Sequence, residues 1–233
     1  MSAQTLAERV GSDPKSVGRW VAGSVTPHPT TRWAVADVLE EDEMALWPSA
    51  VRSTVKTGAD REVHEVFPTH SAVPATLWQK LVNDAKREIV FCDVVSYWYW
   101  YEVPDLTRIL REKAQAGCRV RVTVGDPADP AVRADEEATD IPLTLTSRIQ
   151  QTLHQLEPLR GLIEVRRTSM AAAGGRSVYR GDDQAVAHWW LHGQMGIDFP
   201  ALHLRRRMDG GIFDQMAVRH VDALWEAAAP VWP

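Results

Sequence analysis

The chain is poor in cysteine, in excess charge and in long apolar runs. Its 233 residues include only two cysteines, Cys92 and Cys118, each inside an apolar, strand-like stretch. We therefore expect buried thiols of a reducing compartment rather than a disulfide framework. No apolar run approaches the roughly 18 to 20 residues of a membrane span, and no basic start followed by an apolar stretch marks a signal peptide. These absences predict a cytoplasmic protein with no membrane partner.

Positive charge is also scarce, because the net charge is −5. Any nucleic-acid binding must then come from a local surface rather than from a global basic field. No Cys or His pair stands at metal-ligand spacing, so we expect no metal and no cofactor. What the chain does have is 45% hydrophobic and 24% charged residues, which is typical of a globular protein. Its length suits a small domain followed by a medium one.

The first 48 residues have the pattern of four short helices. An amphipathic stretch over residues 2–10 ends at Gly11, whose freedom suits a left-handed exit. A second helix begins at once and ends at Gly23; its cap is Ser12 or Asp13, its first turn contains Pro14, and its apolar stripe is Val17, Trp20 and Val21. A third helix follows a cap at Thr30 or Thr31, and a short fourth helix covers 42–47.

The first two of these helices, joined by a tight turn, form a helix-turn-helix pattern. The stretch A-E-R-V-G-S-D-P-K-S-V-G-R-W-V-A-G, followed by R-W-A-V-A-D-V-L and D-E-M-A-L-W-P, resembles the lambda-repressor-like (Xre-type) regulators of actinobacteria. The resemblance implies a domain over residues 1–48 that binds double-stranded DNA. It departs from the family in one respect: the helix that normally precedes the motif is not in this sequence, so either the start is truncated or the domain is minimal.

In this interpretation the second helix enters the major groove and supplies the DNA contacts. The residues expected to contact DNA are Ser12, Lys15, Ser16 and Arg19. Arg19 is the expected base-reading residue, because a guanidinium pairs bidentately with guanine. The alternatives are a solvated helix face and, for the whole domain, a small helical module that docks another protein.

Residues 49–62 are polar and aperiodic, and we interpret them as a linker. From Val63 the pattern alternates between strands and helices, which predicts a parallel pair with a right-handed crossover. We expect strands over 63–67, 88–95, 119–124, 163–168, 177–180, 184–190 and 202–206, and helices over 74–86, 106–116, 130–138, 144–156 and 213–228.

The segment G-R-S-V-Y-R-G-D, starting at Gly175, is similar to the H-x-K-x-x-x-x-D strand of the phospholipase D superfamily. Gly175 stands at the position of the nucleophilic His and Ser177 at that of the phosphate-binding Lys, while Asp182 keeps the final position. Phosphoryl transfer through this motif needs the imidazole and the cation. The resemblance therefore implies a single, catalytically inactive phospholipase-D-like repeat over 63–233, and not an enzyme. Because the family's cleft forms between two repeats, it also implies a homodimer.

The carboxyl ends of the parallel strands are where a ligand site is expected. Aromatic and polar residues gather there in the sequence, as in small-molecule pockets, and core or dimer interface is the alternative interpretation of the aromatic run. The residues expected to bind a ligand are Asp93, Ser96, Tyr97, Trp98 and Trp100 after one strand, Asp126 after the next, and Ser177, Tyr179, Arg180 and His188 on the hairpin.

The sequence as a whole thus predicts an α/β protein: a small all-α helix-turn-helix domain followed by one phospholipase-D-like α/β repeat. Its expected function is that of a dimeric transcription regulator with a possible small-molecule effector. A phosphodiesterase or nuclease directed to DNA is the alternative, although His188, His192 and His203 all lack a Lys two residues later. A phage-repressor-like protein without a small ligand is a further alternative.

Overall fold

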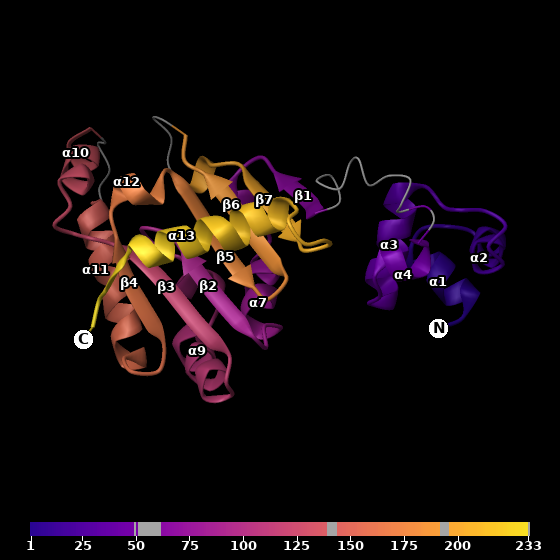
Figure 1. The fold of residues 1–233 in the computed structure, drawn as a ribbon, viewed down its shortest axis with the longest axis horizontal. Helices are drawn as coiled ribbons and strands as arrows, with labels where there is room; N and C mark the ends of the chain where they lie inside the picture. Colours follow the sequence, from indigo (N-terminus) through magenta and orange to yellow (C-terminus); the bar gives the residue numbers. More distant parts are fainter. Residues whose placement is uncertain (49, 51–61, 139–143, 192–195, 233) are drawn as a thin grey trace. The chain divides into compact units, whose positions relative to one another are not determined.

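The computed structural model describes residues 1–48, 50, 62–138, 144–191 and 196–232 (Figure 1). The chain divides into two compact units, Met1–Gly58 and Ala59–Pro233. The expected linker over 49–62 lies outside the described residues apart from Ala50 and Glu62. Among the described residues, no helix combines the length and the apolar character needed to cross a membrane.

The first unit is helical, as expected. Its helices are α1 (Ala3–Arg9), α2 (Pro14–Val21), α3 (Pro29–Leu39) and α4 (Glu43–Leu46). Side-chain caps explain three of the starts, because Ser2, Asp13 and Asp42 each accept a backbone N–H of the first turn. Glycines in left-handed conformation follow two of the ends, at Gly11 (φ 65°) and Gly23 (φ 67°).

The core of this unit is small and consists of Leu6, Ala7, Val17 and Val35. The expectation that Val21 belongs to the apolar stripe is wrong, because its side chain is 80% exposed. Val21 is the last residue of α2. Periodicity gives the direction of a side chain but not whether a neighbouring helix extends far enough to cover it.

A buried ion pair joins α3 to α4. Arg32 Nε donates to Glu43 Oε1 at 2.6 Å, and both side chains are almost completely buried. Trp33 Nε1 donates to the other carboxylate oxygen at 3.0 Å, and Arg32 also donates to the Pro27 carbonyl at 2.8 Å. The charges are therefore paired as well as hydrogen-bonded, which is the condition under which burial of an ion pair is tolerated.

The second unit is built on a mixed sheet. In the part of the chain that the structure describes, eight strands follow the order β1-β7-β6-β5-β2-β3-β4-β8. Their bounds are β1 (Val63–Phe67), β2 (Glu88–Cys92), β3 (Arg119–Gly125), β4 (Glu164–Thr168), β5 (Arg176–Gly181), β6 (Gln184–Trp189), β7 (Ala201–Arg205) and β8 (Ala229–Pro230).

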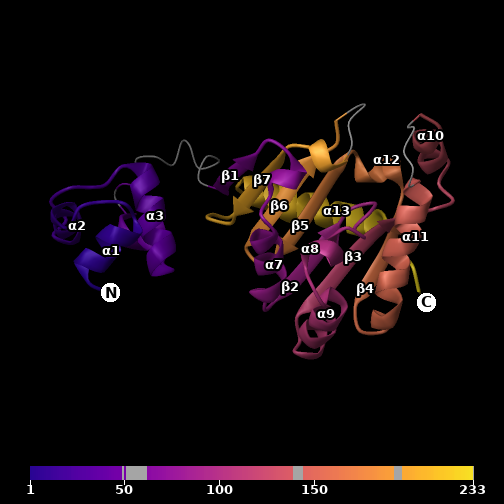
Figure 2. The same ribbon diagram turned by 180° about the vertical axis from the view of Figure 1, so that it is seen from behind.

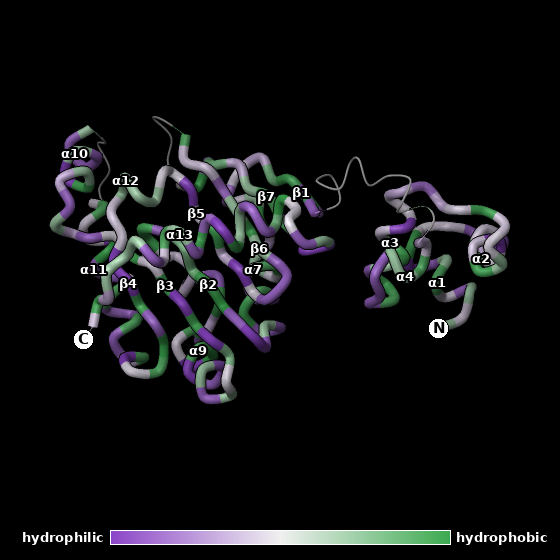
Figure 3. Tube along the Cα trace, in the orientation of Figure 1, coloured by the Kyte–Doolittle hydropathy of each residue, from purple (hydrophilic) through white to green (hydrophobic). Residues whose placement is uncertain are grey.

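Strands β2, β3 and β4 are parallel, whereas β5 and β6 form an antiparallel hairpin. The expected strand–helix–strand unit is therefore present as β2, α9 (Leu106–Gln115) and β3. Strand β2 lies between β3 and β5. It is hydrophobic along most of its length in Figure 3, as a strand covered on both faces must be.

Helices cover the two faces of the sheet. Helix α13 crosses one face in Figure 1, and the view from behind in Figure 2 shows helices α7, α8, α9 and α11 over the other. The bounds of these and the remaining helices are α7 (Ala75–Asn83), α8 (Tyr99–Glu102), α10 (Pro130–Ala138), α11 (Leu145–Leu156), α12 (Met170–Ala173) and α13 (His220–Ala227), with a π-helical turn over Asp214–Arg219 before α13.

Several features of this unit differ from the expectation. The aromatic run after β2 contains a short helix, α8, that its composition did not predict. The short helix α12 and the two-residue strand β8 were not expected either. Glu62, assigned to the linker, is completely buried, and its carboxylate accepts the backbone N–H groups of Arg207, Met208 and Phe213. Glu62 therefore fixes the start of the second unit. Both cysteines are free and buried, as expected.

Candidate functional sites

Helix α2 presents a polar face that its own N-terminal cap organises. The Asp13 carboxylate accepts the Ser16 backbone N–H at 2.9 Å and the Ser16 hydroxyl at 2.6 Å. These hydrogen bonds hold the pKa of the Asp13 carboxyl below its usual value. Arg19 Nη2 donates to the same Ser16 hydroxyl at 3.1 Å. Val17, with 1% exposure, is directed into the core.

The predicted DNA-contacting residues thus fall into two kinds. Lys15 and Arg19 are exposed. Ser12 and Ser16 are half-buried and already engaged: the Ser12 backbone N–H donates to the Ala7 carbonyl at 2.9 Å, while the Ser16 hydroxyl contacts Asp13 and Arg19. Of these four predicted residues, only Lys15 and Arg19 combine an exposed side chain with a positive charge suited to DNA.

Charge is unevenly distributed along the first unit. Within residues 1–48, the exposed Arg and Lys side chains are on α1 and α2, where they are Arg9, Lys15 and Arg19, whereas Arg32 is buried in its ion pair. Acidic residues dominate the later part of this described stretch, where they are Asp37, Glu40, Glu41, Asp42 and Glu43. Of these 48 residues, those of the first two helices therefore offer the exposed positive charge that a polyanion needs.

In the second unit, several predicted ligand residues do meet at the carboxyl end of β2. The Tyr179 hydroxyl donates to Asp93 Oδ2 and lies 3.4 Å from the Ser96 hydroxyl. Burial raises the pKa of the Asp93 carboxyl to about 6, against the opposing effect of hydrogen bonds from Tyr179 and Ser177. All four residues are buried, three of them completely. They form a polar cluster inside the fold rather than an open site.

Aromatic rings surround this polar cluster. The Trp98 ring lies 5.0 Å from that of Tyr179, 4.9 Å from Trp78 and 4.3 Å from His70. Tyr99 stacks on Tyr179 at 5.3 Å with an interplanar angle of 9°. Because the rings contact one another, they constitute a closed aromatic core. The alternative interpretation of the aromatic run as core is correct for Tyr99, which has no exposed surface.

Two histidines at the edge of this core have unsatisfied nitrogens. The rings of His70 and His188 are 5.1 Å apart, and the Nδ1 atom of each is buried without a hydrogen-bond partner. Burial lowers the pKa of His188 to about 3 and that of His70 to about 4, so both imidazoles are neutral near pH 7. Buried polar atoms of this kind are uncommon in native proteins and often mark a bound water or ligand.

The other predicted ligand residues do not join this cluster. Trp100 donates to Thr107 at 2.8 Å, Tyr97 contacts Tyr101 at a ring distance of 6.1 Å, and Asp126 accepts the Ala128 backbone N–H at 3.0 Å. Each is therefore engaged locally.

Arg180 is a correction, because it lies on the opposite face of the sheet. It pairs with Glu88 and donates to the Ala217 carbonyl at 2.7 Å, beside the C-terminal helical segment. Side chains alternate along a strand, so Arg180 cannot share a face with Tyr179. Strand periodicity could have excluded it. Conversely, His70 and Trp78 were missed, and no signal in their local sequence links them to β5.

In the β5–β6 hairpin, the three positions that were compared with the phospholipase D motif, Gly175, Ser177 and Asp182, each have a structural role. Gly175 is left-handed, with φ 68°. Ser177 is completely buried and accepts a hydrogen bond from Trp190 Nε1 at 3.1 Å. Asp182 accepts the backbone N–H groups of Lys86, Arg87 and Glu88 at 2.8, 2.9 and 2.8 Å.

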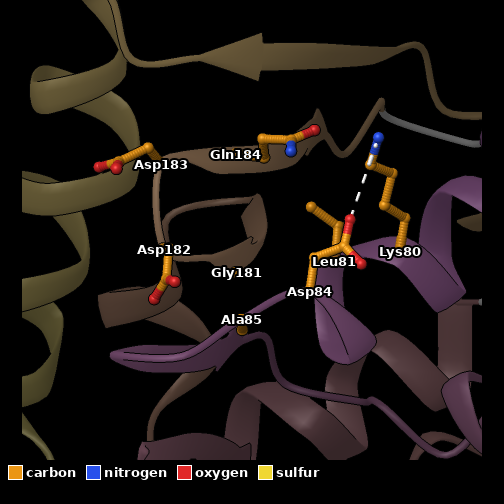
Figure 4. A pocket seen from close by; sticks show the side chains of 8 residues that line it. All are labelled: Lys80, Leu81, Asp84, Ala85, Gly181, Asp182, Asp183 and Gln184. Atoms are coloured by element: carbon orange, nitrogen blue, oxygen red, sulfur yellow. Dashed lines mark ion pairs between the residues drawn. The ribbon is translucent and has the colours of Figure 1, made fainter. Parts of the chain in front are cut away.

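A shallow pocket of about 180 Å³ lies at the other end of the hairpin. Figure 4 shows its lining, in which Lys80 and Asp84 form an ion pair at 4.0 Å. The lining residues are Lys80, Leu81, Asp84, Ala85, Gly181, Asp182, Asp183 and Gln184. None of the predicted ligand residues belongs to it. Within the described residues, no group of three or more His, Cys, Asp or Glu side chains could hold a metal ion.

Comparisons with known proteins add little to this geometry. No protein-family model matches the chain, and no curated protein sequence matches it. Among solved structures, it is similar to one described as "Structure of TrmBL2, an archaeal chromatin protein, shows a novel mode of DNA binding", with 12% identity and a TM-score of 0.45 over 99% of this chain and 98% of that chain. A TM-score of this size carries no argument about this chain, whose function must be argued from its own residues.

Proposed function

We propose that the protein is a transcription regulator that binds duplex DNA through α2. The observation that carries this proposal is the pair of exposed cations, Lys15 and Arg19, on a short helix whose only buried residue is Val17. A guanidinium at this position can pair with guanine and discriminate against other bases by about 1–3 kcal/mol. Lys15 is suited to a phosphate, which positions the helix without reading sequence.

The charge distribution supports a defined orientation on DNA. Phosphates attract the α1–α2 surface and repel the acidic segment after α3, where Glu40, Glu41 and Asp42 are exposed. Opposite local charges on one small unit favour one face for binding and disfavour the other. The net charge of −5 of the whole chain is therefore compatible with binding to DNA, which is a polyanion.

The second unit, in this proposal, is a degenerate phospholipase-D-like repeat that makes the homodimer and has no phosphodiesterase activity. The roles of Gly175 and Ser177 support the absence of catalysis, because neither supplies an imidazole nucleophile or a phosphate-binding cation. The unpartnered Nδ1 atoms of His70 and His188 support a small effector at the carboxyl end of the sheet. Its identity is not part of the proposal.

Selection from a random duplex pool tests DNA binding. We expect the full-length wild type to enrich a specific sequence, Arg19→Ala to lose that enrichment, and Lys15→Ala to weaken binding evenly across sequences with a smaller salt dependence. The matched control is Arg108→Ala, which removes an exposed arginine of α9 and should enrich the wild-type sequence.

A wild type that enriches no duplex, while its first unit captures a protein partner, would establish the docking-module alternative instead.

The proposed homodimer and the proposed absence of catalysis are tested by separate measurements. Light scattering at tens of micromolar should give the mass of a dimer, and bis-(p-nitrophenyl) phosphate should remain unhydrolysed. Turnover that disappears in His188→Ala would refute the absence of catalysis.

A further inference from the structure

Gly18 occupies an exposed position in the interior of α2, the fifth residue of a helix that runs from Pro14 to Val21. Glycine is unfavourable at such a position relative to alanine, because it loses more backbone entropy on folding. A glycine in a helix interior therefore needs an explanation, which is either a left-handed backbone conformation or a neighbouring atom that leaves no room for a side chain. The described residues around it give none, because a Cβ atom built on Gly18 would meet none of their atoms within 4 Å.

Of the other described glycines, all but Gly196 do have a reason. At Gly125, Gly181 and Gly211 an added Cβ would come closer than 3.0 Å to a neighbouring atom, whereas at Gly196 it would make an ordinary van der Waals contact with Phe199 at 3.9 Å. The remaining described glycines are in the left-handed region: Gly11, Gly23, Gly117, Gly161, Gly174, Gly175 and Gly210. Among the glycines that the structure describes, Gly18 alone has neither a positive φ nor a neighbour.

The position of Gly18 relates it to the proposed DNA surface. It is three residues after Lys15, which places the two on neighbouring positions of one helix surface, and it directly precedes Arg19. Val17, on the other side, is buried against α1 and α3. Lys15 and Arg19 are four residues apart and also neighbours on the helix surface, so the position without a side chain lies beside the pair of exposed cations.

We propose that Gly18 is a positioning residue for DNA binding, a role that rests on the proposed function. Without a side chain at this position, the α2 backbone can approach the edges of the bases closely enough for Arg19 to reach guanine. A side chain here would hold the helix away from the floor of the groove. A side chain at this position would mainly reduce the affinity for the specific sequence. Contacts to phosphates tolerate a longer distance than bidentate contacts to bases.

The experiment compares full-length variants on the duplex that the wild type enriches. We expect Gly18→Leu to lose at least tenfold in affinity for this duplex while keeping its affinity for a scrambled duplex. Gly18→Ala should lose less affinity while unfolding at a higher temperature than the wild type, because alanine favours the helix. The matched control is Ala45→Leu, which adds the same side chain at an exposed position of α4 and should bind like the wild type.

The outcomes separate this inference from the proposed function. If the wild type and Arg19→Ala behave as proposed but Gly18→Leu binds the enriched duplex like the wild type, the role of Gly18 is refuted and the regulator remains. If the wild type enriches no duplex, both are refuted. Should Gly18→Leu fail to fold, Gly18→Ala decides: weaker specific binding together with a raised unfolding temperature supports the role, and unchanged binding overturns it.

Discussion

Asp182 is the residue whose role the structure explains most directly. Burial raises the pKa of its carboxyl, but hydrogen bonds from the backbone N–H groups of Lys86, Glu88 and Arg87 outweigh burial, and the net effect is a lowered pKa. The carboxylate thereby holds the segment that leads into β2 against the turn between β5 and β6. Its neighbour Asp183 only makes ion pairs with Arg87 and Arg206, with half of its own side chain exposed.

Asn substitutions at these two positions give a matched test. We expect Asp182→Asn to lower the free energy of unfolding by about 2–3 kcal/mol, because the charged acceptor for three backbone donors is lost. Asparagine tolerates the left-handed backbone at this position, where φ is 48°. Asp183→Asn should cost less than about 1 kcal/mol, as exposed ion pairs do. Urea unfolding measures both, and equal losses would contradict the assigned role of Asp182.

At the scale of elements, the ion pair between Arg32 and Glu43 holds α3 and α4 of the first unit together. The hydrophobic core of this unit is small, so a buried pair contributes a large share of its cohesion. Removing one partner of such a pair leaves the other charge buried without compensation, which is more costly than replacing both.

Glu43→Gln should therefore destabilise the first unit by about 3 kcal/mol, because Arg32 stays buried without an anion. Glu41→Gln, an exposed position two residues earlier, is the control and should leave the stability within about 0.5 kcal/mol of the wild type. Thermal unfolding followed by tryptophan fluorescence measures the difference. A Glu43→Gln protein that unfolds at the same temperature as the wild type would contradict the expected cost of leaving Arg32 buried without its anion.

In the second unit, three histidines with strongly lowered pKa values couple stability to pH; His188 and His203 are buried and His70 is partly buried. Burial lowers the pKa of His188 to about 3, that of His203 to about 3 and that of His70 to about 4. The unfolded chain titrates these groups near 6.5, so it binds more protons than the folded state below that pH. Stability is then fully present above about pH 6.5 and decreases as the pH falls towards 4.

Asp93 acts in the opposite direction. Burial raises the pKa of its carboxyl to about 6, so the folded state binds this proton more tightly than the unfolded chain, and stability rises as the pH falls from 6 towards 4. Because three histidines oppose one carboxyl, we expect a net loss of stability on acidification over this range.

Urea midpoints measured between pH 7 and pH 4.5 check this expectation. His188→Asn should reduce the slope of stability against pH, because it removes one of the groups that bind a proton on unfolding. His154→Asn, which changes an exposed histidine of α11, is the control and should keep the wild-type slope. A stability that rises on acidification would show that Asp93 outweighs the histidines.

The sequence by itself determined the order and type of most elements. The cap at Asp13, the left-handed glycine Gly11 and the apolar run of β2 are local signals, and the structure places helix ends and a strand where they predicted them. The expected cap at Thr30 or Thr31 is wrong, because α3 begins at Pro29, after His28. The buried free cysteines followed from equally local context. The alternation of side chains along a strand also predicts that Tyr179 and Arg180 lie on opposite faces of the sheet, although the expected ligand site included both residues.

Only the tertiary structure decided which side chains meet. His70 and Trp78 join Trp98 and Tyr179 because η2 (His70–Ala72) and α7 pack over the end of β5. Glu62 became part of the second unit because backbone N–H groups about 150 residues away in the sequence bind its carboxylate. Val21, the last residue of α2, stayed exposed because the described residues do not cover its side chain. Such contacts depend on how distant elements pack together, and neither composition nor periodicity specifies that packing.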